Sequence, residues 1–162
     1  MEGVIKMIYK NRELNKYPEI ILSDCLIAHI EKGDNTVIIQ FSEYGFIRKE
    51  DKDSKYYRTD DSQIVIEGCD IDEIEIKEVR TCHVKKADYC QLLRDITMEE
   101  FVKNVNQSKW KIEIVEEFYS VGGALYTARV RENENSFWCY IKFNFKNIIY
   151  LWNDMKYDWL VN

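Results

Sequence analysis

Residues 137–143 read FWCYIKF, and this short stretch decides the fold class. Its odd-numbered positions hold Phe, Cys, Ile and Phe, while Trp138, Tyr140 and Lys142 stand between them. Successive side chains of a β-strand point to opposite faces, so the odd-numbered set is expected to cover a core. This alternation is typical of an antiparallel sheet.

The same alternation recurs through most of the chain, in residues 36–41, 63–67, 73–77 and 110–114. Short segments rich in Asn, Asp and Gly separate these stretches, and such residues favour tight turns. We therefore expect an α+β fold that is mainly antiparallel β. About eight to ten strands would form two layers or a curled, barrel-like sheet.

One helix is expected at residues 97–106. Thr97 and Glu100 have the spacing of a capping box, and apolar residues follow at helical spacing: Met98, Phe101, Val102 and Val105. The helix separates a strand group at about 20–84 from a second group at about 110–153. Because no Pro- or Gly-rich linker divides them, we expect residues 1–162 to form a single domain. Residues 1–16 fit a strand or a helix, and we expect a strand.

The composition restricts the class of protein. The 162 residues are 46% hydrophobic and 14% aromatic, which excludes a disordered polymer. The start of the chain has no signal-peptide pattern, and no stretch approaches the roughly 20 apolar residues of a membrane span. Five cysteines are an odd number and indicate reduced thiols. We expect a cytoplasmic protein; its many Ile, Lys and Asn residues indicate AT-rich coding, typical of some bacteria.

Negative charge is concentrated between residues 60 and 78. This segment has eight acids and one base, Lys77, whereas the rest of the chain has 21 acids and 22 bases. We expect a hairpin whose acidic face binds a basic protein. The candidate residues are Asp60, Asp61, Glu67, Asp70, Asp72, Glu73 and Glu75. A solvated outer face is the alternative. A divalent metal site is disfavoured because the spacing matches no calcium loop.

Aromatic residues gather near the C-terminus and supply a second candidate surface. Trp138, Tyr140 and Trp152 would form an aromatic patch for a protein partner. Alternatively, both faces of the strand at 137–143 are covered by the fold. Stacking on nucleic-acid bases is not expected, since the chain carries a net charge of −6 and phosphate contacts dominate such binding.

No motif recommends catalysis. Cys82 and His83, with Asp88 and Cys90 nearby, are too widely spaced to indicate zinc. The paired acids Glu116 and Glu117 have the chemistry of an acid and a base, but nothing else marks them. We assign no catalytic residue, no metal and no cofactor.

We therefore expect a non-catalytic protein-binding module, for example an immunity or antitoxin-type inhibitor that masks a cationic toxin or nuclease. A small-ligand-binding, barrel-like protein is the alternative, and an enzyme without a recognisable motif is the third. We expect a basic protein as partner and neither nucleic acid nor a membrane.

Overall fold

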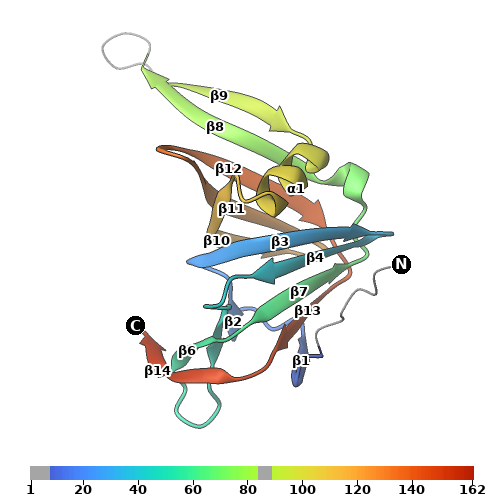
Figure 1. Cartoon of the computed structure of the whole chain (residues 1–162). Helices are drawn as coiled ribbons and strands as arrows, with labels where there is room; N and C mark the ends of the chain where they lie inside the picture. Colours follow the sequence, from blue (N-terminus) through green and yellow to red (C-terminus); the bar gives the residue numbers. More distant parts are fainter. Residues whose placement is uncertain (1–7, 84–88) are drawn as a thin grey trace.

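Two antiparallel sheets and one helix make up the fold (Figure 1). The computed structural model describes residues 8–83 and 89–162, excluding the side chains of 81–92. The large sheet has the strand order β1 (Asn11–Leu14), β13 (Asn147–Trp152), β7 (Ser62–Glu67), β4 (Thr36–Phe41), β3 (Cys25–Gly33), β10 (Lys111–Ser120), β11 (Gly123–Glu132), β12 (Asn135–Asn144), β8 (Glu75–His83) and β9 (Tyr89–Ile96). The small sheet has the order β14 (Met155–Val161), β6 (Tyr56–Thr59), β5 (Ile47–Lys49) and β2 (Ile20–Ile21).

The expected α+β class, dominated by antiparallel strands, is confirmed. The large sheet is open, with β1 and β9 at its edges, and does not close into a barrel. The described residues form fourteen strands rather than eight to ten. The additional strands are short: β2 has two residues and β5 has three, too few for an alternating pattern to be recognisable in the sequence.

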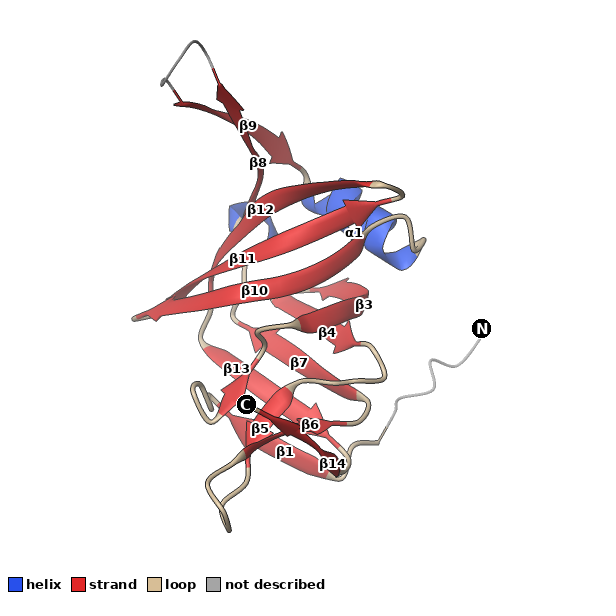
Figure 2. Cartoon of the chain, turned by 90° about the vertical axis from the view of Figure 1, so that its left-hand side faces the viewer, coloured by secondary structure: helices blue, strands red, loops and turns tan. Residues whose placement is uncertain are grey.

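The inner face of the large sheet is covered from two sides. The small sheet packs over one end, where Phe46 is fully buried and its ring contacts those of Tyr150 and Trp152. The helix α1 (Met98–Asn106) covers the other end, where the Phe101 and Trp110 rings meet (Figure 2). Buried side chains from both ends belong to one continuous hydrophobic cluster.

The expected helix is confirmed, with the expected cap. Thr97 Oγ1 accepts the Glu100 backbone N–H at 3.1 Å. At the other end, the Asn106 side-chain amide donates to the Ile30 carbonyl at 2.9 Å and accepts the Ile30 N–H at 2.9 Å, which fixes α1 to β3. In the N-terminal segment, β1 pairs with β13, while residues 1–7 lie outside the described part.

The β8–β9 hairpin leaves the body of the sheet. The ladder between β12 and β8 runs from Lys142 opposite Glu75 to Trp138 opposite Val79. Beyond Val79, β8 continues to pair with β9 alone, and the two strands project away as an arm (Figures 1 and 2). The sheet therefore forks at the start of β12.

Candidate functional site

The acidic segment does not form the expected hairpin. β7 lies between β13 and β4, whereas β8 lies between β12 and β9 at the far side of the sheet. The prediction that Glu67 and Glu75 project from paired strands is therefore wrong. Alternation in a sequence shows which face a residue occupies, but not which strand lies beside it.

The seven acidic candidates divide into two sets. Asp60 and Asp61 lie in the turn between β6 and β7, and the Asp154 N–H donates to Asp60 Oδ1 at 3.1 Å. The other five surround the short 3₁₀ helix η1 (Ile71–Glu73): Glu67, Asp70, Asp72, Glu73 and Glu75. The six-residue strand β7 separates the sets by about 20 Å. We call the second set the acidic group.

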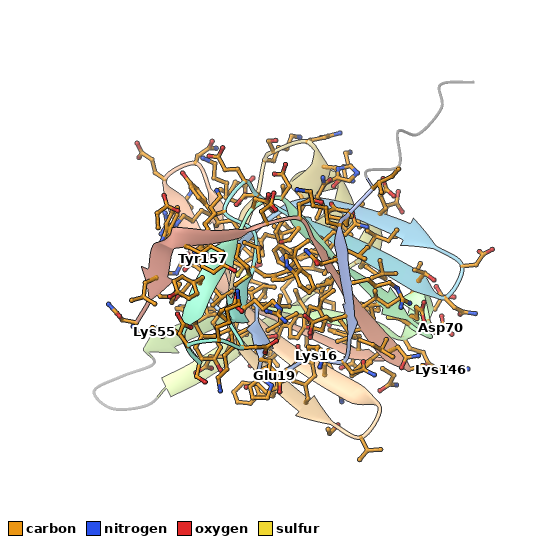
Figure 3. All side chains as sticks on the ribbon, turned by 90° about the horizontal axis from the view of Figure 1, so that it is seen from below. Lys16, Glu19, Lys55, Asp70, Lys146 and Tyr157 are labelled. Atoms are coloured by element: carbon orange, nitrogen blue, oxygen red, sulfur yellow. The ribbon has the colours of Figure 1, made fainter. Side chains whose placement is uncertain are left out.

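The acidic group lies on the surface. Asp70, Asp72, Glu73 and Glu75 are exposed, and Glu67 is half-buried. Asp70 Oδ1 accepts the Asp72 N–H at 3.0 Å, which caps η1 and accounts for one of the five carboxylates. Asp70 and Lys146 lie at the same edge of the molecule (Figure 3). The group has the exposure needed to attract a cationic partner.

The aromatic candidates also separate. Trp138 is 47% exposed and Tyr140 is half-buried, and both lie on the outer face of β12, opposite the buried Cys139 and Ile141. Trp152 does not belong to their patch, because it is 4% exposed and packs on the inner face with Phe46. Its position in β13, rather than its residue type, decides its role.

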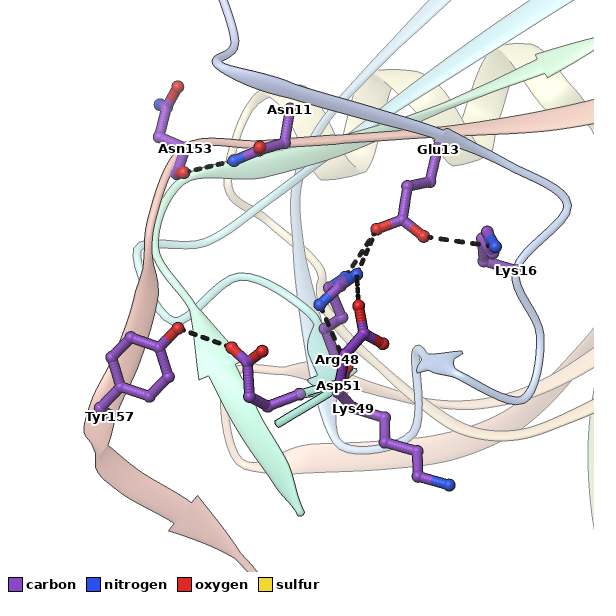
Figure 4. A network of polar contacts seen from close by, with 9 residues as sticks. Asn11, Glu13, Lys16, Arg48, Lys49, Asp51, Asn153 and Tyr157 are labelled. Atoms are coloured by element: carbon purple, nitrogen blue, oxygen red, sulfur yellow. Dashed lines mark hydrogen bonds and ion pairs between the residues drawn. The ribbon is translucent and has the colours of Figure 1, made fainter. Parts of the chain in front are cut away.

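Trp152 is held by a polar network that joins the two sheets. The Arg48 guanidinium lies 5.0 Å from the centre of the Trp152 ring. It is also 2.6 Å from Glu13 Oε1 (Figure 4). Nearby, the Tyr157 hydroxyl donates to Glu50 at 2.6 Å, and this hydrogen bond lowers the pKa of the Glu50 carboxyl. The contacts of Arg48 attach β5 to β1 and β13 of the large sheet, whereas the Tyr157–Glu50 hydrogen bond holds β14 against the end of β5 within the small sheet. These structural roles account for the residues of the network without a binding role.

A hollow opens where β8 departs from β12, and we call it the notch. It has a volume of about 1330 Å³ and is lined by residues of β8, β9, β10, β11, β12 and the segment before β10. Its aromatic walls are Trp110, Phe137, Trp138 and Tyr140. Val79 lies opposite Trp138 on the outer face, and the neighbouring Leu93 of β9 is 52% exposed. The notch is thus an open surface around Trp138 in which aromatic rings stand among polar and charged side chains.

Polar side-chain atoms at and beside the notch lack partners. Trp110 and Thr127 line the notch, and their Nε1 and Oγ1 atoms are buried from solvent with no hydrogen-bond partner in the described part of the chain. Arg129 Nε is in the same condition beside it, with the guanidinium stacked 5.3 Å from the centre of the Trp138 ring. A buried donor without an acceptor costs about 1–3 kcal/mol.

A buried carboxylate closes the inner side of the notch. Glu78 is 2% exposed; it contacts Arg80 and accepts a hydrogen bond from Arg94 Nε at 2.7 Å. Burial raises the pKa of this carboxyl, but the hydrogen bonds and charges of Arg94 and Arg80 outweigh burial and keep the pKa below its usual value. Arg94 also reaches Glu100 of α1 at 3.3 Å. With two carboxylates against two guanidinium groups, this cluster carries no surplus positive charge for phosphate.

The described residues do not bring together any of the catalytic or metal-binding residues considered from the sequence. Within them, no three His, Cys, Asp or Glu side chains gather as metal ligands. Adjacent residues of a strand point to opposite faces, so Glu116 is exposed and Glu117 is buried, and this pair cannot act together. The backbone register sets Cys82 opposite Cys90, but their side chains, and residue 88, lie outside the described part.

Comparison with other proteins adds no identity. No family model, curated protein or solved structure matches this chain. No helix of the described part is long and apolar enough to cross a membrane.

Between the large sheet and α1 the core leaves a cavity of only about 20 Å³, roughly the size of one water molecule. That filled interior weighs against the barrel-like ligand binder.

Sequence reasoning found part of the notch and missed the rest. It selected Trp138 and Tyr140 from their place in an aromatic strand. It missed Trp110, Thr127 and Arg129, because nothing in the sequence shows that a polar atom will be buried without a partner. The open edge at the start of β12, on the side away from β11, was equally hidden, since it depends on where β8 departs.

Proposed function

We propose that the chain is a non-catalytic protein-binding module of the immunity or antitoxin type, which masks a basic protein in the cytoplasm. The single observation that carries the proposal is the notch. It combines an exposed tryptophan with an arginine whose guanidinium is stacked on that tryptophan. Trp and Arg are the residues most enriched among those that dominate binding energy.

The proposed occupant is an extended segment of the partner. Residues 135–137 of β12 and 80–83 of β8 lie beyond the ladder that joins these strands, so each has a strand edge facing the notch. Extended peptides bind such edges through main-chain hydrogen bonds.

The acidic group gives the partner its expected charge. Glu75 and Val79 lie four residues apart on the outer face of β8, which corresponds to about 13 Å. A standard interface buries about 800 Å² on each side and spans a larger distance than this. One basic partner can therefore cover the acidic group and the notch together, with charge increasing the association rate and the notch giving affinity.

Affinity capture from the source cells, followed by binding measurements with the purified captured protein, tests the proposal. Trp138→Ala is expected to weaken binding about tenfold or more, in the range of residues that dominate interfaces. Phe118→Ala is the matched control, because Phe118 is 52% exposed on the outer side of β10 and does not line the notch. Equal losses for the two variants would contradict the proposal.

Charge reversal tests the acidic group separately. The double variant Glu73→Lys with Glu75→Lys is expected to slow association and to reduce its dependence on salt. Asp61→Lys is the matched control, since Asp61 is an exposed acid at the other end of β7. If Asp61→Lys slows association as much as the double variant, the acidic group is not the contact.

A further inference from the structure

A second hollow lies far from the notch, where three connections of the chain meet. It has a volume of about 270 Å³ and is walled mainly by four rings: Tyr17, Tyr119, Phe145 and Tyr150. Tyr17 comes from the connection between β1 and β2, Tyr119 from the end of β10, and Phe145 from the turn between β12 and β13. We call this hollow the tyrosine pocket.

The rings of the tyrosine pocket pack as a unit. The Tyr17 and Tyr119 ring centres are 4.7 Å apart, and those of Tyr119 and Phe145 are 6.2 Å apart and nearly perpendicular. Tyr150 is 1% exposed and forms the floor, whereas Tyr17 is 44% exposed and forms the outer wall. Aromatic faces carry negative charge density and attract cations.

The outer wall is fixed in place before any ligand binds. The Asn15 N–H donates to the Ile148 carbonyl at 2.8 Å, and Asn15 Oδ1 accepts the Ile148 N–H at 2.8 Å. Its side-chain amide also donates to Asn147 Oδ1 at 3.1 Å. These three hydrogen bonds attach the segment carrying Tyr17 to β13. A pocket that is already ordered loses less entropy when it binds.

A buried carboxylate lies directly behind the rings. Glu117 is 6% exposed; it accepts the Tyr119 hydroxyl at 2.6 Å and the Leu22 N–H at 2.7 Å. The Tyr119 and Tyr126 hydroxyl oxygens are 2.9 Å apart. The Tyr119 hydroxyl therefore connects Glu117 to the wall of the pocket. From this position the negative charge of Glu117 adds to the attraction of a cation in the pocket.

No cation of the protein occupies or lines the pocket as described. Its lining contains no Lys, Arg, Asp or Glu. Two lysines are near in sequence, and neither of them lines the pocket. Lys16 lies 3.8 Å from Glu13, and the Lys146 side chain packs over Gly68. The two lie well apart when the molecule is seen from below (Figure 3).

From this arrangement we infer that the tyrosine pocket binds a small methylated or quaternary ammonium cation. Aromatic walls, a buried carboxylate behind them and a lining without charged side chains are the features that recognise such a group. A bare ammonium ion holds water more strongly, so methylated forms are the preferred class. This site is independent of the proposed function at the notch.

Calorimetric titration with choline and with 3,3-dimethylbutan-1-ol tests the inference. The two compounds have the same shape, and only choline is charged. Choline is expected to bind about tenfold or more tightly than the neutral alcohol. Equal affinity for both compounds would overturn the inference, and so would a failure of choline to bind.

Two variants locate the site and one serves as a control. Tyr17→Leu removes a ring from the exposed wall, and is expected to weaken choline binding while leaving binding of the alcohol nearly unchanged. Glu117→Gln removes the charge and keeps the shape, and is expected to reduce the preference for choline. Phe118→Ala alters a ring outside the pocket and is expected to change neither affinity. Thermal unfolding confirms that each variant folds; choline binding unaffected by both pocket variants would overturn the assignment.

The pH dependence supplies a further readout. Burial raises the pKa of Glu117 to about 7, so choline should bind more tightly at about pH 8 than at about pH 6. The groups that face Glu117 are neutral over this range, since burial raises the pKa of each: Tyr119, Tyr126, Tyr150 and Cys25. The Arg58 guanidinium contacts Cys25 Sγ at 3.8 Å. A Glu117→Gln variant with the same pH dependence as the wild type would overturn the role of Glu117.

Discussion

Replacing Glu117 by Gln should change how the stability of the protein depends on pH. The wild-type carboxyl has little contact with water, and burial raises its pKa from 4.5 to about 7. Hydrogen bonds from Tyr119 and the Leu22 N–H lower the pKa but do not outweigh burial. Ionising this group in the folded state therefore costs free energy that the unfolded chain does not require.

The magnitude follows from the shift. One pKa unit corresponds to about 1.4 kcal/mol, so a shift from 4.5 to about 7 corresponds to about 3 kcal/mol. Because the folded-state pKa is the higher one, this stabilisation is complete below about pH 4.5 and is lost as the pH rises through about 7. The carboxyls of Glu78 and Glu50 have lowered pKa values in the folded protein. Their contribution to stability is therefore present at neutral pH and is lost as the pH falls.

Urea unfolding at several values between about pH 5 and pH 8 measures the effect. The wild type should lose up to about 3 kcal/mol of unfolding free energy across this range, and Glu117→Gln should lose much less. Glu116→Gln is the matched control, since Glu116 is the exposed neighbour on the opposite face of β10. Parallel stability curves for the two Gln variants would refute the reasoning.

Further predictions concern the turns and the helix. Gly45→Ala should destabilise the protein more than Gly68→Ala, although both glycines have positive φ. At position 45 the new Cβ would lie 2.1 Å from the Asp60 backbone oxygen, which cannot easily move. At position 68 the new Cβ would meet the Lys146 side chain instead. Chemical unfolding should show a cost of at least about 1–2 kcal/mol at position 68 from the left-handed backbone alone. Thr97→Ala should cost about 1 kcal/mol by the same measurement, because it removes the helix cap, whereas Thr97→Ser should cost little.

Local patterns in the sequence predicted the elements well. Alternation in FWCYIKF and in the other stretches identified most of the long strands, and the pairing of Thr97 with Glu100 identified the helix start. These features depend on residues a few positions apart, so they are visible in the sequence. Short strands such as β2 and β5 have too few residues to alternate, and they were missed.

Strand order could not be predicted in the same way. β3 pairs with β10, and β1 with β13, across more than 80 residues of sequence. The hairpin expected at residues 60–78 was wrong because consecutive strands were assumed to be neighbours. Consecutive strands are neighbours only about two times in three.

The candidate site was also predictable only in part from the sequence. Trp138 and Tyr140 were identifiable because they are aromatic residues at positions where a strand usually meets water. The unpartnered donors of Trp110 and Arg129 depend on which strands surround them, and the raised pKa of Glu117 depends on the bulge at Val115 that turns its side chain inward. Such properties arise only from the assembled sheet.

Hydrogen–deuterium exchange of the chain, free and bound to its captured basic partner, tests the central claim most directly. An extended segment in the notch should protect the backbone amides of residues 135–140 in β12 and 79–83 in β8, and Trp138→Ala should reduce that protection. Protection confined to the other edge of the sheet, at β1, with no change in β12 or β8, would contradict the claim that the notch binds the partner.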